Sequence, residues 1–140
     1  MSMYTKFFKD VSLSDINQVG GKNASLGELW QHLAPQGVQL PNGFATTSDA
    51  YRYFLESAGI RDRIADILAS IDVQNVKDLQ SKAAEVRGLI IAAAFPADLE
   101  QEIRDGYAEL CRLCGRENLV VAIRSSATAE DLPNASFAGQ

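Results

Sequence analysis

The stretch Leu119-Val120-Val121-Ala122-Ile123 decides the fold class, and Arg124-Ser125-Ser126-Ala127-Thr128 follows it directly. The first stretch is a continuous apolar run with branched residues side by side, which is typical of a strand buried on both faces. The predicted strand ends at Arg124, because the composition then changes to small and hydroxylated residues. Residues 125–140 are therefore expected to form a loop, with room for a short helical turn.

Helical patterns fill most of the sequence before this strand. The clearest one opens with Pro96 and acidic residues in its first turn, and it ends at Gly115. Apolar residues recur at helical spacing over residues 26–33 and again in three stripes between residues 51 and 94. We expect these three stripes to be buried, and Asn75 to cap the last of the three helices.

A second short strand is predicted at Phe44-Ala45-Thr46, after turn-forming residues and before Thr47 or Ser48, which are suited to cap the next helix. Both kinds of secondary structure are therefore expected, and helix exceeds strand. The sequence predicts one α+β domain over residues 1–140.

Composition and charge narrow the possible functions. Hydrophobic residues make up 46% and charged residues 22%, as in an average globular domain that folds in water. The formal net charge of -5 leaves no basic surface for a phosphate backbone, which argues against nucleic acid as a partner. No apolar run reaches the roughly 18 residues needed to span a bilayer. Charges interrupt the N-terminus where a signal peptide is apolar, so we expect a cytoplasmic protein with no membrane partner.

The first motif that could carry chemistry is Gly20-Gly21-Lys22-Asn23, immediately before the helix over residues 26–33. Unpaired backbone N–H groups and the positive end of the helix dipole favour an anion there. Glycines allow the backbone to approach a phosphate, and Lys22 adds a mobile positive charge. The alternative is a flexible turn followed by a surface lysine, since the motif is not a P-loop.

The second motif is Arg124-Ser125-Ser126-Ala127-Thr128, at the carboxyl end of the predicted strand. Ligands of open α/β sheets usually bind at that end. The planar guanidinium of Arg124 matches the geometry of phosphate oxygens. The neighbouring hydroxyls, of which that of Ser125 is the nearest in sequence, can donate to the same anion. The alternative is that Arg124 pairs with Glu130 or Asp131 in a structural ion pair.

A third segment, Ala135-Ser136-Phe137-Ala138-Gly139-Gln140, consists of small residues around one phenylalanine. Such a segment can form a thin flap whose backbone N–H groups reach a phosphate. It could equally begin an edge strand.

Some residues suggest chemistry that we do not assign to them. Cys111 and Cys114 lack the further ligands of a zinc site and lie at the end of a predicted helix, where a thiolate is not stabilised, so both are expected to be buried packing residues. His32 has no neighbouring carboxylate in sequence that would orient it as a base. Glu130 and Asp131 are expected to orient Arg124 or the loop and not to bind magnesium.

Taken together, these segments resemble the signatures of the phosphoenolpyruvate-utilising dikinases. The resemblance rests on Val19-Gly20-Gly21-Lys22-Asn23-Ala24-Ser25-Leu26-Gly27-Glu28-Leu29 and on Ile123-Arg124-Ser125-Ser126-Ala127-Thr128-Ala129-Glu130-Asp131-Leu132-Pro133, which residues 135–140 extend. Pro41-Asn42-Gly43-Phe44-Ala45-Thr46-Thr47 is similar to a segment between them, although Asn42 stands where a second proline is more usual. Within the family, two segments are more similar to phosphoenolpyruvate synthases than to pyruvate phosphate dikinases, which tend to carry glycine in these places. They are Asn23-Ala24-Ser25-Leu26 and Ser125-Ser126-Ala127-Thr128-Ala129-Glu130-Asp131.

The resemblance implies an ATP-grasp type nucleotide-binding domain, of which this chain is the helix-rich N-terminal portion, incomplete at its C-terminal end. By position, Gly21, Lys22, Arg124 and Ser125 would contact ATP phosphates, and Gly139 would contribute backbone to the loop over them. The magnesium ligands and the histidine that carries the phosphoryl group are expected outside this chain. No catalytic or metal-binding residue is therefore assigned within it.

The same resemblance implies an enzyme that converts ATP, pyruvate and water to AMP, phosphoenolpyruvate and phosphate. Pyruvate would bind to downstream domains, and the isolated chain is expected to be inactive. One alternative is a related dikinase with another acceptor, such as a rifampicin phosphotransferase or a pyruvate phosphate dikinase. Another is a non-catalytic module that binds a nucleotide or a partner subunit.

Overall fold

The computed structural model describes residues 4–129 of the chain, and these fall into two compact units. The first unit is formed by residues up to Ala50 together with those from Gln101 onward, and the second by Tyr51–Glu100. Helices dominate both units, in keeping with the predicted α+β class, and no helix in the described part is long and apolar enough to cross a membrane.

The first unit contains a two-stranded antiparallel sheet, in which β1 (Thr5–Phe7) pairs with β2 (Phe44–Thr46). Lys6 lies opposite Ala45, and the rings of Phe7 and Phe44 are 5.5 Å apart on neighbouring strands. The predicted strand at residues 44–46 is therefore confirmed. Its partner β1 lies close to the N-terminus of the chain.

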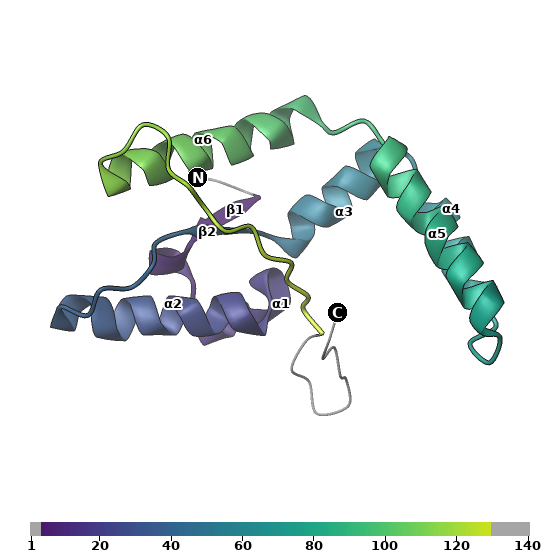
Figure 1. Ribbon diagram of the computed structural model, residues 1–140, viewed down its shortest axis with the longest axis horizontal. Coiled ribbons are helices and arrows are strands. Elements are labelled where there is room, and N and C mark those ends of the chain that lie inside the picture. Colours follow the sequence, from purple (N-terminus) through teal and green to yellow (C-terminus); the bar gives the residue numbers. More distant parts are fainter. Residues whose placement is uncertain (1–3, 130–140) are drawn as a thin grey trace. The chain divides into compact units, whose positions relative to one another are not determined.

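Helices α1 (Ile16–Val19) and α2 (Gly21–Leu33) follow two short 3-10 turns and lie next to this sheet (Figure 1). Val11, Val19, Ala24 and Ala45 form the buried core between them, with Ile16 packed against it. Helix α2 covers the predicted helix and begins several residues earlier, directly after Gly20. A 3-10 turn, Ala34–Gln36, then ends at Gly37, directly after the predicted end of the helix at residue 33.

Helix α6 (Ala97–Cys114) belongs to the first unit from Gln101 onward, and this part of the helix is hydrogen-bonded to β1 and the residue before it. The carboxylate of Glu102 accepts hydrogen bonds from the backbone N–H of Tyr4 at 2.6 Å and from the Thr5 hydroxyl at 3.2 Å. The predicted end of this helix at Gly115 is confirmed, because Gly115 has a φ of 66° and the N–H of Arg116 donates back to the Cys111 carbonyl.

The second unit contains most of α3 (Ser48–Ser57) with α4 (Arg61–Ala69) and α5 (Val76–Ala92). The predicted cap of α5 is confirmed, since the Asn75 side chain accepts from the N–H groups of Lys77 and Asp78. The expected burial is only partly met. Phe54, Leu55 and Ile64 are buried, Tyr51 is exposed, and no described residue of α5 is fully buried.

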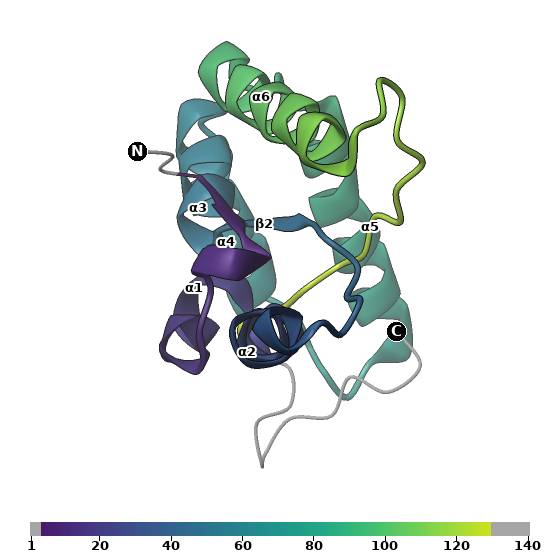
Figure 2. The same cartoon turned by 90° about the vertical axis from the view of Figure 1, so that its left-hand side faces the viewer.

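The predicted strand at residues 119–123 is wrong. This segment is irregular, and the side chains of Val120 and Ile123 are 96% and 95% exposed. A doubly buried strand requires neighbouring strands and covering layers, and the only sheet among residues 4–129 is the β1–β2 pair. Instead, the Tyr107 hydroxyl donates a 2.8 Å hydrogen bond to the Leu119 carbonyl, and the chain returns toward α1 and α2 (Figures 1 and 2).

Candidate functional site

The first motif forms the sharp junction between α1 and α2. Gly20 has φ 82° and ψ 160°, a backbone conformation that is essentially restricted to glycine. Its N–H donates to the Ile16 carbonyl at 2.8 Å and closes α1, while its own carbonyl accepts from the Ala24 N–H at 3.0 Å and opens α2. One residue thus ends one helix and begins the next, and Gly21 and Lys22 lie in the first turn of α2.

The second motif is bound to this junction. The carbonyl oxygen of Val19, at the end of α1, accepts a 2.8 Å hydrogen bond from the hydroxyl of Ser126. The same oxygen accepts a 2.7 Å hydrogen bond from the side-chain amide of Asn23. A carbonyl oxygen has two lone pairs, so the Val19 oxygen can accept both hydrogen bonds. One donor comes from each motif.

Close backbone packing accompanies these hydrogen bonds. A Cβ atom added to Gly20 would lie 2.4 Å from Ser126 Oγ and 2.8 Å from the carbonyl oxygen of Ala127. Contacts below about 3 Å are not tolerated by a real side chain, so only glycine permits the two segments to approach this closely. Two segments far apart in sequence, one around Gly20 and the other around Ser126, therefore meet at one place.

The predicted site residues lie on either side of this contact. Gly21 is half-buried and Lys22 is exposed on α2, while Arg124 and Ser125 are exposed on the segment that ends at Ser126. No ion pair joins Arg124 to another residue within 4–129. Gly139, Glu130 and Asp131 lie outside the described residues, so the flap and the proposed pairing of Arg124 stay predictions.

Sequence reasoning did not identify the residues that join the motifs. Gly20, Asn23 and Ser126 stand in the sequence as parts of a motif, and membership of a motif gives none of them a role of its own. The doubled glycine was an available signal, because a glycine between two helical segments suggests a special backbone angle. The convergence of two side chains on one carbonyl depends on a tertiary contact, and no local pattern predicts such a contact.

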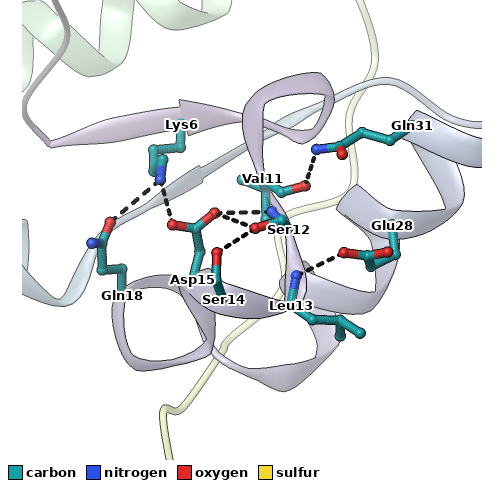
Figure 3. Close-up of polar contacts among 9 residues, drawn as sticks. All are labelled: Lys6, Val11, Ser12, Leu13, Ser14, Asp15, Gln18, Glu28 and Gln31. Atoms are coloured by element: carbon teal, nitrogen blue, oxygen red, sulfur yellow. Dashed lines mark hydrogen bonds and ion pairs between the residues drawn. The ribbon is translucent and has the colours of Figure 1, made fainter.

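The body of α2 is held in place by polar contacts with the segment that follows β1 (Figure 3). The Glu28 carboxylate accepts from the Leu13 N–H at 2.9 Å, and the Gln31 side chain donates to the Val11 carbonyl at 2.8 Å. Gly27 brings the helix close to this segment, because a Cβ there would lie only 2.1 Å from the Val11 carbonyl oxygen. The start of α2 is therefore fixed by contacts along the length of the helix as well as by Gly20.

Asp15 connects this segment to the sheet. Lys6 Nζ donates to its carboxylate at 2.7 Å, and the backbone N–H of Ser12 donates at 2.9 Å. The hydrogen bond from Lys6, followed by that from Ser12, lowers the pKa of the Asp15 carboxyl below its ordinary value. The carboxylate of Asp15 thus caps the 3-10 turn before α1 and joins it to β1.

Two expectations about reactive side chains need correction. Cys111 is buried as expected, but Cys114 is exposed and is the last residue of α6. His32 does have an acidic neighbour: its Nε2 lies 3.2 Å from Glu28 Oε2, one helical turn earlier. Among residues 4–129 there is no group of three or more metal-ligating side chains that could hold a metal ion.

The Tyr107–Cys111 pair lies on α6 within the first unit. A hydrogen bond between the Tyr107 hydroxyl and the Cys111 side chain is the main cause of a raised pKa at Tyr107. The bond from the Tyr107 hydroxyl to the Leu119 carbonyl holds the chain that follows α6 against this part of the helix. We assign it a structural role.

Residues 16–140 match the family described as pyruvate phosphate dikinase, AMP/ATP-binding domain, and the chain belongs to this family. Among curated proteins it is 51% identical to the phosphoenolpyruvate synthase of Pseudomonas aeruginosa over 140 residues, which is 100% of this chain and 17% of that protein. It is 47% identical to the phosphoenolpyruvate synthase of Helicobacter pylori, covering 98% of this chain and 17% of that protein. For that of Escherichia coli, the identity is 46%, over 96% of this chain and 17% of that protein. The chain thus spans about one sixth of the length of these relatives.

Proposed function

We propose that this chain is the N-terminal segment of the nucleotide-binding domain of a phosphoenolpyruvate synthase. The enzyme would convert ATP, pyruvate and water to AMP, phosphoenolpyruvate and phosphate. The observation that carries the proposal is the contact between the two motifs, in which Ser126 and Ala127 pack against Val19 and Gly20. The family's AMP/ATP-binding description and the names of the relatives agree with it.

In this proposal, the contact brings two kinds of phosphate-binding group to one side of the nucleotide. The first turn of α2 offers backbone N–H groups, the helix dipole and the Lys22 ammonium. The other segment offers the Arg124 guanidinium, which can bind two phosphate oxygens at once, and the Ser125 hydroxyl. Phosphoryl transfer requires mainly positioning and charge stabilisation, and these groups supply both.

The finer fold assignment, an ATP-grasp domain, is part of the proposal. In such a domain the nucleotide lies between two halves, and this chain would supply the half that binds phosphates. Magnesium would neutralise phosphate charge when bound. In this proposal the magnesium ligands, the phosphocarrier histidine and the pyruvate site lie in other parts of the enzyme.

The full-length protein that carries this segment tests the proposal. It is incubated with magnesium-ATP and pyruvate, and the products are followed by phosphorus NMR. Formation of AMP and phosphoenolpyruvate without added phosphate supports the synthase. A strict requirement for inorganic phosphate, with pyrophosphate as product, would instead identify a pyruvate phosphate dikinase, and transfer to rifampicin a rifampicin phosphotransferase. Nucleotide binding with no turnover on any acceptor would favour a non-catalytic module.

A further inference from the structure

The Val19 carbonyl is bound by one side chain from each motif. Asn23 Nδ2 and Ser126 Oγ donate to this oxygen at 2.7 Å and 2.8 Å. Asn23 lies in the first turn of α2, beside Lys22, and Ser126 lies next to Ser125 and two residues after Arg124. Neither donor is among the groups assigned to the phosphates. Their shared acceptor is a backbone oxygen, whose position is fixed by the backbone of α1 and not by a side-chain rotamer.

We infer that Asn23, Ser126 and the Val19 carbonyl form a clasp that sets the position of Arg124 and Ser125 relative to the start of α2. Asn23 and Ser126 are positioning residues in this inference, which rests on the proposed function. They act through Lys22 and Arg124 and do not touch the nucleotide themselves.

Three features favour a role in positioning Arg124 and Ser125 over a role in stability alone. Arg124 and Ser125 are exposed and belong to an irregular segment, so no helix or strand holds them. The Ser126 hydrogen bond spans 107 residues of sequence, whereas the Asn23 bond is local to the α1–α2 junction. Because Gly20 has no side chain, the backbone of Ala127 can lie directly against the α1–α2 junction. The segment that carries Arg124 and Ser125 is therefore also held at Ala127, the residue after Ser126.

The consequence for catalysis follows from geometry. A guanidinium that binds phosphate oxygens bidentately must be held within a fraction of an ångström of its working position. Misplacement of a binding group by about 1 Å can cost on the order of a hundredfold in rate. Loss of the clasp should therefore affect the use of ATP and leave the pyruvate site unchanged.

The test uses Ser126→Ala, Ser126→Thr and Asn23→Ala in the full-length protein. We expect Ser126→Ala and Asn23→Ala each to lower kcat/KM for ATP by roughly tenfold or more, with an unchanged KM for pyruvate. Ser126→Thr keeps a hydroxyl donor and should stay within about threefold of the unmodified protein. Thermal unfolding of each variant shows whether the protein remains folded.

Ser70→Ala is the matched control. Ser70 Oγ donates to the Ile67 carbonyl at 2.7 Å, so the control also removes a hydroxyl-to-carbonyl bond, but from the second unit. It should leave kcat/KM for ATP unchanged. Lys22→Met and Arg124→Met are measured in parallel, because retained turnover in both would contradict the proposed function itself.

Two outcomes would overturn the clasp alone. In the first, Lys22→Met and Arg124→Met lose activity while Ser126→Ala keeps its kcat/KM for ATP within twofold. In the second, Ser126→Thr is as defective as Ser126→Ala, which would mean that the hydroxyl is not what matters. A loss in Ser126→Ala that Ser126→Thr restores, at unchanged pyruvate KM, supports the inference.

Discussion

The hydroxyl of Ser126 donates a 2.8 Å hydrogen bond to the carbonyl oxygen of Val19, 107 residues earlier in the chain. Val19 is the last residue of α1, and its carbonyl oxygen also accepts a hydrogen bond from the Asn23 side chain. The contact joins the two motifs that carry the proposed phosphate-binding groups. In the proposed function, the placement of these phosphate-binding groups therefore depends on the α1–α2 junction as well as on the charged residues beside it.

Arg124→Met in the full-length protein should remove a phosphate-binding charge. Because Arg124 is exposed, stability should change little, and turnover should fall by at least roughly a hundredfold, as when one charge-stabilising donor is lost. Steady-state assay of phosphoenolpyruvate formation measures this. Arg116→Met, at another exposed arginine of the first unit, is the control and should be near normal. Normal turnover in Arg124→Met would refute the assignment of this residue.

Lys22→Met should produce a defect of similar size, with a larger share in ATP affinity. Lys22 lies in the first turn of α2, where its ammonium adds a positive charge to the positive end of the helix dipole. We expect the KM for ATP to rise more than in Arg124→Met. Comparison of KM for ATP with kcat in the two variants measures the difference. An unchanged KM for ATP would argue against a phosphate contact by Lys22.

Gly20→Ala should destabilise the chain by about 3 kcal/mol. Part of this is the backbone conformation at φ 82° and ψ 160°, which costs a non-glycine residue about 1–3 kcal/mol. The rest comes from the collision of the new Cβ with Ser126 Oγ and the Ala127 carbonyl.

The control for Gly20→Ala is Gly37→Ala. Gly37 also has a positive φ, of 84°, but nothing lies within 4 Å of an added Cβ. It should cost only about 1 kcal/mol. Urea unfolding of both variants measures the two costs, and equal values would show that the contact at Gly20 contributes nothing.

Gly27→Ala should also destabilise, although alanine is normally the better helix residue by about 1 kcal/mol. Gly27 lies inside α2, and its added Cβ would lie 2.1 Å from the Val11 carbonyl oxygen. We expect a net loss of at least about 2 kcal/mol. Gly88→Ala, inside α5 with nothing within 4 Å, should instead stabilise by about 0.5–1 kcal/mol. The opposite signs are the result to look for in chemical unfolding, and stabilisation by both would contradict the close packing at Gly27.

The elements that the sequence predicted well are those with local signals. Asn75 and Gly115 act within a few residues, through a side-chain cap and a positive φ, so their positions mark where helices begin and end. The apolar run at residues 119–123 carried a different kind of signal. It indicated a preference for burial, but burial requires a partner, and the described residues supply no strand that pairs with it.

The candidate site was predicted in its parts and not in its assembly. The charged residues Lys22 and Arg124 could be selected because their chemistry suits phosphates. The contact that joins their segments depends on Gly20, whose role is steric, and on the hydroxyl of Ser126, which bonds to a backbone oxygen. Neither role has a local pattern, since both depend on the packing of residues far apart in sequence.

The Lys6–Asp15 pair should make the stability of the chain depend on pH in the acid range. The pKa of Asp15 is lowered in the folded state, chiefly by the hydrogen bond from Lys6 and then by that from the Ser12 N–H. A carboxyl whose folded pKa is depressed binds its proton more readily in the unfolded chain, so stability rises with pH across that range. The contribution is fully present above the ordinary aspartate pKa of 3.8 and is lost as the pH falls through the lower folded pKa.

Asp15→Asn removes this titration and should cost about 1–2 kcal/mol at neutral pH, because the Lys6 ammonium and the Ser12 N–H lose an ionised acceptor. The side chains of Lys6 and Asp15 are only 27% and 16% exposed, so solvent screens the pair less than a surface ion pair.

Other carboxyls also titrate in this range with a lowered pKa: Asp78 bonds to the Asp72 N–H, Asp98 to the Tyr53 hydroxyl, and Glu109 to Arg112. The unfolding free energy of the unmodified chain therefore falls with acid for several reasons. The difference between that chain and Asp15→Asn isolates Asp15, and it should shrink toward zero as the pH falls from the ordinary aspartate pKa of 3.8 through the lower folded pKa. Urea unfolding at closely spaced pH values measures the difference, and a value that does not change over this range would mean that Asp15 is not held ionised by Lys6.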